Sequence, residues 1–246
     1  MSYSEYISKR GFMKKIMIFS GAGLSAESGI STFRDDGGLW SNYDINRICT
    51  AGCLNWNYDE TIHFYNLRRK DIEDKQPNKA HLKIAEIKSK YPDLIDVVTQ
   101  NVDDLLERAN CKDVLHLHGF LREIKCMSCG DIKDISYKKQ ENKLLLCDNC
   151  SSKMRPNVVF FNEAAPKYID LNEKLEDCGL FIVIGTSGNV VDVNYLSKFV
   201  DYSILNNLYK SNAIVESYFD EVHYSKATEA IDSICDSIEN YIKKNS

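Results

Sequence analysis

The sequence predicts an α/β fold, in which helices cover both faces of a parallel β-sheet, and three observations indicate it. Short apolar runs, such as residues 16–19 and 180–184, alternate with segments of helical periodicity. Strands that are apolar at every position are typical of parallel sheets buried on both faces. Several of these runs end in glycine or polar residues, at the sheet edge where ligands bind in open α/β folds.

The first apolar run leads directly into a glycine-rich turn. Gly21, Gly23 and Ala26 form a Gly-x-Gly-x-x-Ala pattern, which is typical of the opening of a dinucleotide-binding unit. The first glycine allows a tight turn, the second lets the backbone approach a pyrophosphate, and the small third residue lets helix pack on strand. The helix that follows would direct its N–H groups at the phosphates. A glycine turn without a ligand is the alternative explanation of this pattern alone.

The segment after this turn differs from that of an ordinary dehydrogenase. Residues 30–40 mix charges with glycines, show no strand periodicity and end in Leu39 and Trp40. A dehydrogenase would reach its second strand within about 30 residues of the glycines. Long loops in compact domains are usually functional or disordered. We therefore expect a flap over the dinucleotide, and an enzyme that consumes it.

The remaining elements follow in alternation. Further strands are expected at 96–99, 114–118, 157–161 and 203–205, and helices at 103–108 and 171–178. The C-terminus predicts an amphipathic helix with its apolar stripe at Ile231, Ile234, Cys235, Ile238 and Ile242. Two insertions interrupt the sheet, a helical one at 43–76 and a cysteine-rich one at 121–154. The remaining ranges, 1–42, 77–120 and 155–246, would form the dinucleotide-binding domain.

Four of the nine cysteines predict a metal site. Cys126, Cys129, Cys147 and Cys150 form two Cys-x-x-Cys pairs with the spacing of a four-cysteine zinc module. Four thiolates leave no open coordination position, so this zinc ion would be structural. An odd cysteine count argues against a disulfide framework. The other cysteines are interpreted as small core residues, at positions 49, 53, 111, 178 and 235.

Composition excludes several classes of protein. A net charge of −5 over 246 residues argues against a dedicated nucleic-acid binder. The sequence has no apolar run near the ~18 residues that span a membrane, and its N-terminus lacks the apolar core of a signal peptide. We therefore expect a cytoplasmic protein. Since no exposed apolar stripe is evident, we expect a monomer.

Three further motifs stand where predicted strands end: Gln100-Asn101-Val102-Asp103, His118-Gly119 and Gly185-Thr186-Ser187. Together with the glycine turn and the cysteine pairs, in this order, they make the chain resemble the sirtuins, NAD-dependent protein lysine deacylases. The resemblance spans nearly the whole sequence. It implies an inverted Rossmann-like large domain, a small domain built from the two insertions, and an acyl-lysine peptide in the cleft between them.

The resemblance also implies residue roles. His118 matches the catalytic base, and Asn101 matches a catalytic position at the nicotinamide. The alternatives without a catalytic role are a structural histidine for His118 and a helix N-cap for Asn101. His116 matches no catalytic position and is interpreted as support. The NAD-binding positions would be Gly21, Ala22, Gly23, Glu27, Ile30, Thr32, Phe33, Arg34, Trp40, Gln100, Asn101, Asp103, Gly185, Thr186, Ser187, Asn206 and Ala227. Val158, Val159 and Phe160 resemble the strand that pairs with the substrate backbone.

A pair of residues in the helical insertion bears on the acyl group. Tyr65 and Arg68 share a helix face, and they match the pair that binds the distal carboxylate in the sirtuins that remove succinyl and malonyl groups. A solvated basic face over residues 68–70 is the alternative. We expect a deacylase for acetyl and for succinyl or malonyl groups, which yields nicotinamide, O-acyl-ADP-ribose and free lysine.

Two other functions compete with this one. A mono-ADP-ribosyltransferase or NAD glycohydrolase shares the early chemistry but needs no carboxylate-binding pair. A sensor without activity would not need His118 or Asn101. The sequence also departs from the family at Asn162, where glycine is usual, and at Asp192, where proline is common. We expect a strained backbone at Asn162, a residue that tolerates positive φ, and a looser segment at Asp192.

Overall fold

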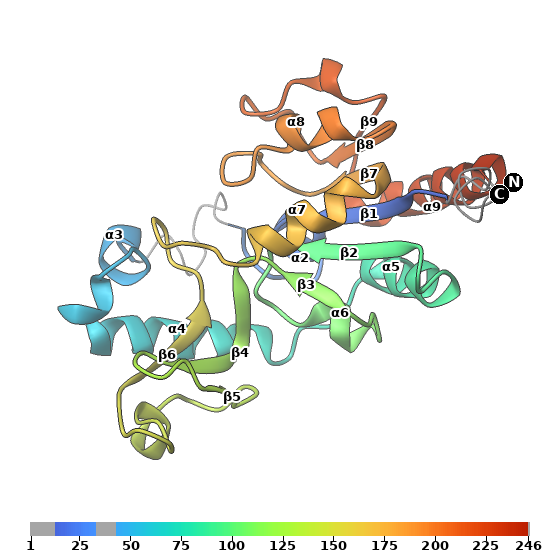
Figure 1. Ribbon diagram of the computed structural model, residues 1–246. Helices are drawn as coiled ribbons and strands as arrows, with labels where there is room; N and C mark the ends of the chain where they lie inside the picture. Colours follow the sequence, from blue (N-terminus) through green and yellow to red (C-terminus); the bar gives the residue numbers. More distant parts are fainter. Residues whose placement is uncertain (1–12, 33–42, 246) are drawn as a thin grey trace, which may run out of the picture.

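The computed structural model describes residues 13–32 and 43–245 (Figure 1). Within them, six strands form one parallel sheet in the order β3-β2-β1-β7-β8-β9. These strands are β1 (Lys15–Ser20), β2 (Ile95–Thr99), β3 (Val114–His116), β7 (Cys178–Ile184), β8 (Tyr202–Asn207) and β9 (Glu221–Tyr224). The prediction of a parallel α/β sheet is confirmed. β2 and β7 are buried at every position, which explains the continuous apolar sequence of β7; β2 also buries two polar residues, Asp96 and Thr99.

The strand order places a ligand crevice beside β1. This strand pairs with β2 on one side and with β7 on the other, so the order reverses between β1 and β7. Connections leave the two strands in opposite directions at such a switch point, and a crevice opens beyond their carboxyl ends. The glycine turn at 21–23 follows β1 and the Gly-Thr-Ser segment follows β7. The two predicted phosphate-binding loops therefore lie side by side.

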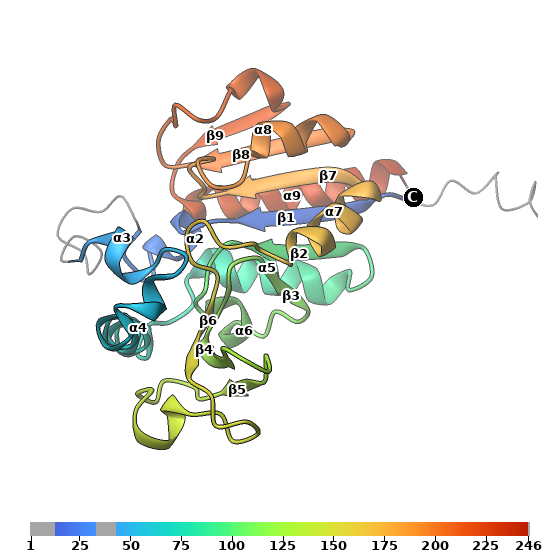
Figure 2. The same cartoon turned by 60° about the vertical axis from the view of Figure 1, so that its left-hand side comes forward.

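Helices cover both faces of the sheet (Figure 2). α5 (Lys79–Lys90) and α9 (Ala227–Asn245) pack on one face of the sheet and form one apolar core with it. α7 (Tyr168–Glu176) and α8 (Val193–Leu196) pack on the other face. The predicted stripe of α9 is confirmed at its four isoleucines, which are buried, whereas Cys235 is only partly buried. Burial of each isoleucine contributes roughly 1.5–3 kcal/mol.

The smaller part of the molecule lies beside the carboxyl ends of these strands. Its helical portion consists of α3 (Ile45–Ile48), the 3₁₀ turn η2 (Cys53–Asn55) and α4 (Tyr58–Ile72). Its other portion is an antiparallel sheet in the order β5-β4-β6, with β4 (Gly119–Cys126), β5 (Ile132–Asp134), β6 (Met154–Val158) and the 3₁₀ turn η3 (Asn142–Leu145). This sheet extends slightly beyond the predicted limits of 121–154; the division into domains stays a prediction.

Several predicted boundaries were wrong. The strand expected at 157–161 ends at Val158 and belongs to the antiparallel sheet, because β6 pairs with β4. The helix expected at 171–178 ends at Glu176, since Cys178 begins β7. Residues 103–108 form only one helical turn, α6 (Leu105–Arg108), and the glycine turn is followed by one turn, α2 (Gly23–Ala26). α5, β9 and two 3₁₀ turns, η4 (Ser197–Phe199) and η5 (Glu216–Tyr218), were not predicted.

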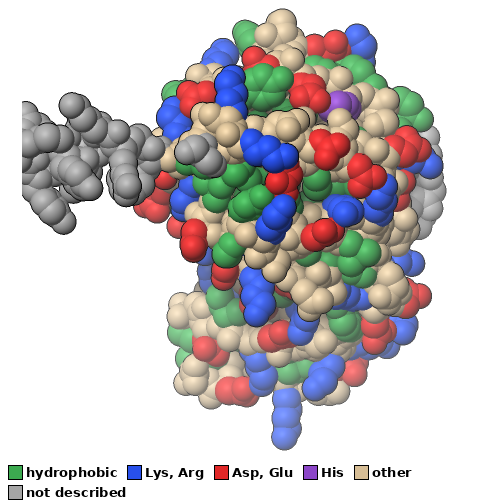
Figure 3. Space-filling view, turned by 90° about the vertical axis from the view of Figure 1, so that its right-hand side faces the viewer, with side chains coloured by type: hydrophobic (Ala, Val, Ile, Leu, Met, Phe, Trp, Pro, Cys, Tyr) green, Lys and Arg blue, Asp and Glu red, His purple; other side chains and the backbone are tan. Residues whose placement is uncertain are grey.

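Charged side chains are distributed over the surface. On the face shown in Figure 3, acidic and basic side chains are interspersed over the described residues and do not gather into one large patch of a single sign. Among the helices of the described ranges, none has the length and apolar character needed to cross a membrane.

Candidate active site

A cavity of about 230 Å³ lies between the two parts of the molecule, at the carboxyl ends of β1 and β2. It brings together residues that are far apart in sequence. The predicted site residues that line it are Ala22, Ile30, Tyr65, Arg68, Gln100, Asn101, Asp103, His118, Val158, Val159 and Phe160. The cavity thus combines predicted cofactor, catalytic and substrate positions. Phe33, Arg34 and Trp40, predicted to bind NAD, lie outside the described residues.

The two glycine loops touch backbone to backbone. The Gly23 N–H donates to the Gly185 carbonyl at 2.8 Å, and the Gly21 N–H donates to Ile184 at 2.9 Å. A Cβ on Gly23 would lie 2.6 Å from the Gly185 Cα, and Gly185 itself has a φ of +66°. Gly23 is therefore required for the approach of the second loop. The sequence had suggested only the approach of a phosphate.

Other predicted cofactor positions surround this contact without lining the cavity. The Thr186 Oγ1 accepts a hydrogen bond from the Gln100 Nε2 at 2.8 Å, and the Ser187 carbonyl accepts one from Ser211. The Asn206 amide donates to the carbonyls of residues 223 and 225. Thr32 is partly buried at the limit of a described segment.

Glu27 occupies an unexpected place. Its carboxylate accepts hydrogen bonds from the backbone N–H of Thr228 at 3.1 Å and from the Thr228 hydroxyl at 2.7 Å. Thr228 lies in the first turn of α9, which begins at Ala227. A carboxylate at this position satisfies a free N–H group and interacts favourably with the helix dipole. In this structure Glu27 therefore links the glycine loop to α9.

Ser25 connects the predicted nicotinamide-binding residues. Its hydroxyl donates to the Asp103 Oδ2 at 3.0 Å and accepts from the Asn101 Nδ2 at 3.1 Å. His81 lies 3.3 Å from the same hydroxyl, and its Nδ1 accepts from the Asn78 N–H in a capping box that begins α5. The Nε2 of His81 must then carry the hydrogen that faces Ser25. Burial lowers the pKa of His81 to about 4 and keeps the ring neutral.

Asp103 is a buried carboxylate at the floor of the cavity. Burial raises its pKa, while hydrogen bonds from the Leu105 N–H and the Ser25 hydroxyl lower it. His116 lies close by: its Nδ1 is 2.8 Å from the Asn101 carbonyl, and its Nε2 is 2.8 Å from Glu107. Burial opposes protonation of His116, but the hydrogen bond and charge of Glu107 outweigh it and raise the pKa. These contacts give His116 a supporting position beneath the loop.

His118 faces the cavity with a defined tautomer. Its Nδ1 lies 3.1 Å from the Gln100 carbonyl, an acceptor only, so Nδ1 carries the hydrogen. Nε2 is therefore the basic nitrogen, and the Tyr168 hydroxyl lies 3.2 Å from it. Burial lowers the pKa of His118, and the Gln100 carbonyl raises it in part. The imidazole is accordingly neutral near pH 7 and able to accept a proton.

The basic run at residues 68–70 does not form a solvated face. Arg68 is 6% exposed and Arg69 is 0% exposed, whereas Lys70 is exposed. The Arg69 Nε donates to the Leu121 carbonyl at 2.9 Å, which ties α4 to β4. Arg68 lines the cavity, and burial lowers its pKa. The alternative that this run is a solvated charge pattern is therefore wrong.

Tyr65 and Arg68 form one wall of the cavity. Tyr65 is 3% exposed, and its ring stacks on Phe160 with 5.4 Å between centroids. Burial raises the pKa of Tyr65, so its hydroxyl stays protonated. A protonated phenol beside a guanidinium can bind a carboxylate with donors from both groups. Cys49, which the sequence assigned to the core, also lines the cavity; burial raises the pKa of its thiol to about 12.

The loop after β6 forms another wall of the cavity. Arg155 pairs with Glu163 at 2.6 Å and donates to the Val158 carbonyl at 2.9 Å, and Glu163 accepts from the Phe160 N–H. Asn162 has a φ of +65°, which confirms the expected left-handed backbone. These bonds satisfy much of the backbone that was predicted to pair with a peptide. The Val159 N–H, for example, donates to the His118 carbonyl.

The departure at Asp192 has the opposite effect from the one expected. The Asp192 carboxylate accepts from the backbone N–H groups of Asn194 and Tyr195 at 3.0 and 3.1 Å. It is the N-cap of α8, a position that favours aspartate and stabilises the helix start. The expected looser segment is not found there.

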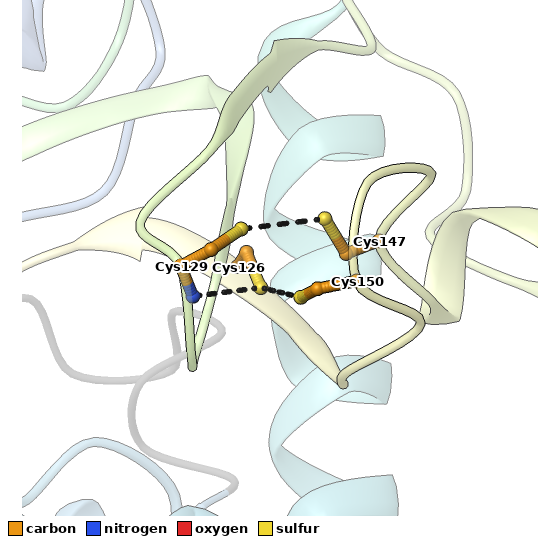
Figure 4. Close-up of side chains that lie close together, drawn as sticks. All are labelled: Cys126, Cys129, Cys147 and Cys150. Carbon is orange, nitrogen blue, oxygen red and sulfur yellow. Dashed lines mark hydrogen bonds between the residues drawn. The ribbon is translucent and has the colours of Figure 1, made fainter.

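The four predicted zinc ligands converge at the far end of the small sheet (Figure 4). The sulfur atoms of Cys126, Cys129, Cys147 and Cys150 all lie within 4.8 Å of one another. Zinc–sulfur bonds of about 2.3 Å in a tetrahedron require sulfur separations of a little under 4 Å. The separations of 3.4 Å for Cys126–Cys150 and 3.7 Å for Cys129–Cys147 fit this geometry. Backbone N–H groups of residues 128 and 129 donate to the Cys126 sulfur, as expected for a thiolate.

Two comparisons of the sequence agree with this site. Residues 21–192 match the model of the Sir2 family. A NAD-dependent protein deacylase of Campylobacter jejuni (strain RM1221) is 48% identical over 232 residues, which cover 94% of this chain and 98% of that protein. A NAD-dependent protein deacylase of Helicobacter hepaticus is 43% identical over 256 residues, which cover 93% of this chain and 99% of that protein.

Solved structures are similar over the whole chain. A mutant Sir2 homologue in complex with ADP ribose has a TM-score of 0.81 and 30% identity, and covers 99% of this chain and 98% of its own. A complex of a Sir2 homologue with NAD has a TM-score of 0.79 and 32% identity, and covers 100% of this chain and 96% of its own.

Proposed function

Because this chain belongs to the Sir2 family, we propose that it removes acyl groups from protein lysines with NAD as co-substrate, and that both acetyl and succinyl or malonyl groups are substrates. The products would be nicotinamide, O-acyl-ADP-ribose and free lysine. The observation that carries the acyl specificity is the burial of Tyr65 and Arg68 in the same cavity as His118 and Asn101. The named activity of its relatives supports the general reaction.

When bound, NAD supplies an electrophilic ribose carbon that the acyl oxygen of the substrate attacks as nicotinamide leaves. The residues of this chain bind and orient it. Asn101 and Asp103 offer amide and carboxylate groups to the nicotinamide and its ribose, and Ser25 holds both side chains in place. The neutral Nε2 of His118 takes a proton from a ribose hydroxyl: the O–H bond breaks, and an N–H bond forms.

A structural zinc ion would hold the small sheet. The four thiolates use every position of a tetrahedral site, so the ion would have no open position for a reactant. Its effect on catalysis would come through the placement of β4 and β6, because β6 leads directly into residues 159–163 of the cavity wall.

The acyl specificity follows from charge and size. A succinyl or malonyl group carries a carboxylate, and desolvation makes a buried guanidinium a strong partner for it. An acetyl group makes no such contact, so its turnover does not depend on the charge of Arg68. The expected pattern is one catalytic centre that serves two classes of acyl group, of which only the acidic class depends on Tyr65 and Arg68.

The test is mass-spectrometric turnover of matched acetyl-lysine and succinyl-lysine peptides, with and without NAD, by wild type, His118→Ala and Arg68→Met. His118→Ala should lose all turnover. Arg68→Met should lose desuccinylation by about 100-fold, because a buried charge-assisted pair contributes on the order of 3 kcal/mol, and should keep deacetylation within a few-fold.

Lys70→Met is the matched control, since Lys70 belongs to the same basic run but is exposed. The Lys70→Met variant should turn over the acetyl-lysine and the succinyl-lysine peptide at the rates of the wild type. An equal effect of Arg68→Met on both peptides would remove the carboxylate-binding role. NAD consumption without any change in the peptides would replace the deacylase proposal with a glycohydrolase or ADP-ribosyltransferase.

A further inference from the structure

Tyr168 contacts the predicted general base, although no sequence motif singled it out. It is the first residue of α7, and it lines the cavity together with His118. Its hydroxyl lies 3.2 Å from the Nε2 of His118, and the ring centroids are 6.2 Å apart. The Gln100 carbonyl holds the opposite ring nitrogen at 3.1 Å. The imidazole is therefore held at both nitrogens, by a fixed backbone acceptor and by a hydroxyl group that can turn.

The difference between these two partners is chemical. A carbonyl only accepts hydrogen bonds, whereas a phenol hydroxyl both donates and accepts. In the neutral imidazole, Nε2 has a lone pair and Tyr168 donates to it. In the imidazolium, Nε2 carries a hydrogen, and the same hydroxyl can rotate and accept from it. Tyr168 can thus bond to the base in either of its protonation states, without any movement of the backbone.

We propose that Tyr168 is a positioning residue for His118: its hydroxyl orients Nε2 while the site is empty, gives up the Nε2 lone pair to the ribose hydroxyl for the proton transfer, and accepts a hydrogen bond from Nε2 once His118 has taken the proton. The inference rests on the proposed function, in which His118 is the general base. Hydrogen bonds to charged groups are stronger than those between neutral groups, so this contact favours the imidazolium over the imidazole. It would offset part of the cost of placing a charge in a buried site.

The other titratable groups of the cavity lie on different elements. Tyr65 and Arg68 come from α4, Asp103 from the segment after β2, Cys49 from the residue after α3, and Glu163 from the loop after β6. Glu163 is paired with Arg155, and Asp103 is bonded to Ser25. Tyr168 is the one group among them with a described hydrogen bond to the His118 ring. Burial raises the pKa of Tyr168, so it stays a neutral hydroxyl where the enzyme works.

The test compares Tyr168→Phe with wild type in two measurements. The first follows the His118 ring by NMR in ¹⁵N-histidine protein as pH is varied, with His118→Gln used to assign its signals. Loss of the hydroxyl should lower the affinity of His118 for a proton about tenfold, the effect of one charge-assisted hydrogen bond. The second measures deacetylation: kcat should fall about tenfold, KM for NAD and peptide should stay within about twofold, and the acid limb of kcat/KM should move to lower pH.

Tyr91→Phe is the control. It also removes one tyrosine hydroxyl hydrogen bond, from Tyr91 to Glu239 at 2.9 Å, but on the far side of the sheet between α5 and α9. It should leave both the His118 titration and the kinetics unchanged. An unchanged titration of His118 in Tyr168→Phe would overturn the proposal. The NMR measurement needs neither NAD nor an acyl peptide, so a failure of the proposed function, seen as undiminished turnover in His118→Ala, is distinguishable from it.

Discussion

Ser25 and His81 determine how the predicted nicotinamide-binding residues are held. One serine hydroxyl contacts Asn101, Asp103 and His81, which come from the loop after β2 and from α5. Its donor capacity goes to the carboxylate, and its lone pairs are left for the amide and the imidazole. A neutral His81 fits this arrangement because its Nε2–H can donate, while its Nδ1 serves the helix cap. The order of the pocket therefore depends on a histidine that stays uncharged.

The low pKa of His81 makes stability depend on pH. Its pKa is about 4 in the fold and near its ordinary 6.5 when unfolded, so the unfolded chain binds a proton that the folded chain excludes. The contribution is fully present above pH 6.5 and is lost as pH falls from 6.5 towards 4, by up to about 3 kcal/mol. Urea unfolding of wild type and His81→Gln across this range measures it. Glutamine suits the same capping box, and its variant should lose less stability towards low pH. Parallel curves for the two proteins would contradict this expectation.

At single positions, the sequence predicted residues that stand at strand ends and missed those that reach them from elsewhere. His118, Asn101 and Asp103 follow apolar runs, and parallel strands end at one edge, so their convergence could be expected. His81 and Tyr168 come from α5 and α7, whose placement depends on packing across the whole sheet. Ser25 lies within the Gly-x-Gly-x-x-Ala pattern and could be noted in the sequence, but its contacts with Asn101, Asp103 and His81 could not be predicted.

At the level of elements, the two glycine loops are in direct backbone contact. Gly23 and Gly185 approach so closely that neither has room for a side chain. The loops follow β1 and β7, which are adjacent strands, so the sheet brings them together and the glycines let them meet. α2 has only one turn, so it offers little of the helix N-terminus that the sequence suggested. The shape of the site here is set by the backbones of the two loops.

Substitution of Gly23 separates this close approach from ordinary backbone strain. Gly23→Ala would place a Cβ 2.6 Å from the Gly185 Cα, whereas Gly29 has a φ of +82° but meets only the Lys75 side chain, at 3.8 Å. Gly29→Ala should cost about 1 kcal/mol of unfolding free energy through its φ. Gly23→Ala should cost at least about 2 kcal/mol through overpacking, despite its ordinary φ. Chemical denaturation of both variants measures the difference, and a Gly23→Ala protein as stable as Gly29→Ala would contradict the packing argument.

Helices differed in how well their sequences predicted them. α9 has four buried isoleucines on one stripe and a solvated opposite face, so its periodicity was clear. α4 buries residues on more than one side, including Arg68 and Arg69, because it packs against β4 and β6 and also faces the cavity. A solvated basic face over residues 68–70 was therefore an open alternative in the sequence. Burial of charge against backbone carbonyls from a distant strand leaves no periodic signal in the sequence.

At the scale of the whole molecule, apolar packing supports the smaller part unevenly: its helical portion has a large apolar cluster, and its cysteine-rich end has a small one. Its cysteine-rich end has a core of five buried residues, two of which are zinc ligands: Ile124, Cys126, Ile135, Cys147 and Met154. A core of this size cannot offset the entropy of ordering the segment without the metal. This end is linked to α4 by the Tyr58 hydroxyl, which donates to the Met154 carbonyl, and by Arg69, which donates to Leu121. Disorder in it would therefore reach the wall that holds Arg68.

Removal of zinc should loosen the cysteine-rich end of the smaller part and leave the six-stranded sheet intact. The protein as purified should hold one zinc ion per chain by mass spectrometry of metals. After treatment with a chelator under reducing conditions, hydrogen exchange should rise strongly in β4, β5 and β6 and moderately in α4, while β1, β2 and β7 keep their protection. Desuccinylation should fall with the loss of zinc, and both properties should recover when zinc is restored. Uniform loss of protection across the six-stranded sheet would show that the metal supports the whole fold.

β1 has to wait for one of its two partner strands while the chain is being synthesised. β1 is the first described strand in the chain, but β7, one of its two partners in the sheet, is synthesised only after most of the chain. Until residues 178–184 leave the ribosome, one side of an almost wholly buried apolar strand has no hydrogen-bond partner. The N-terminal half is thus a poor candidate for independent folding during translation. Fragments that stop before Cys178 should accumulate as aggregates, whereas completion of β7 closes the centre of the sheet in one step.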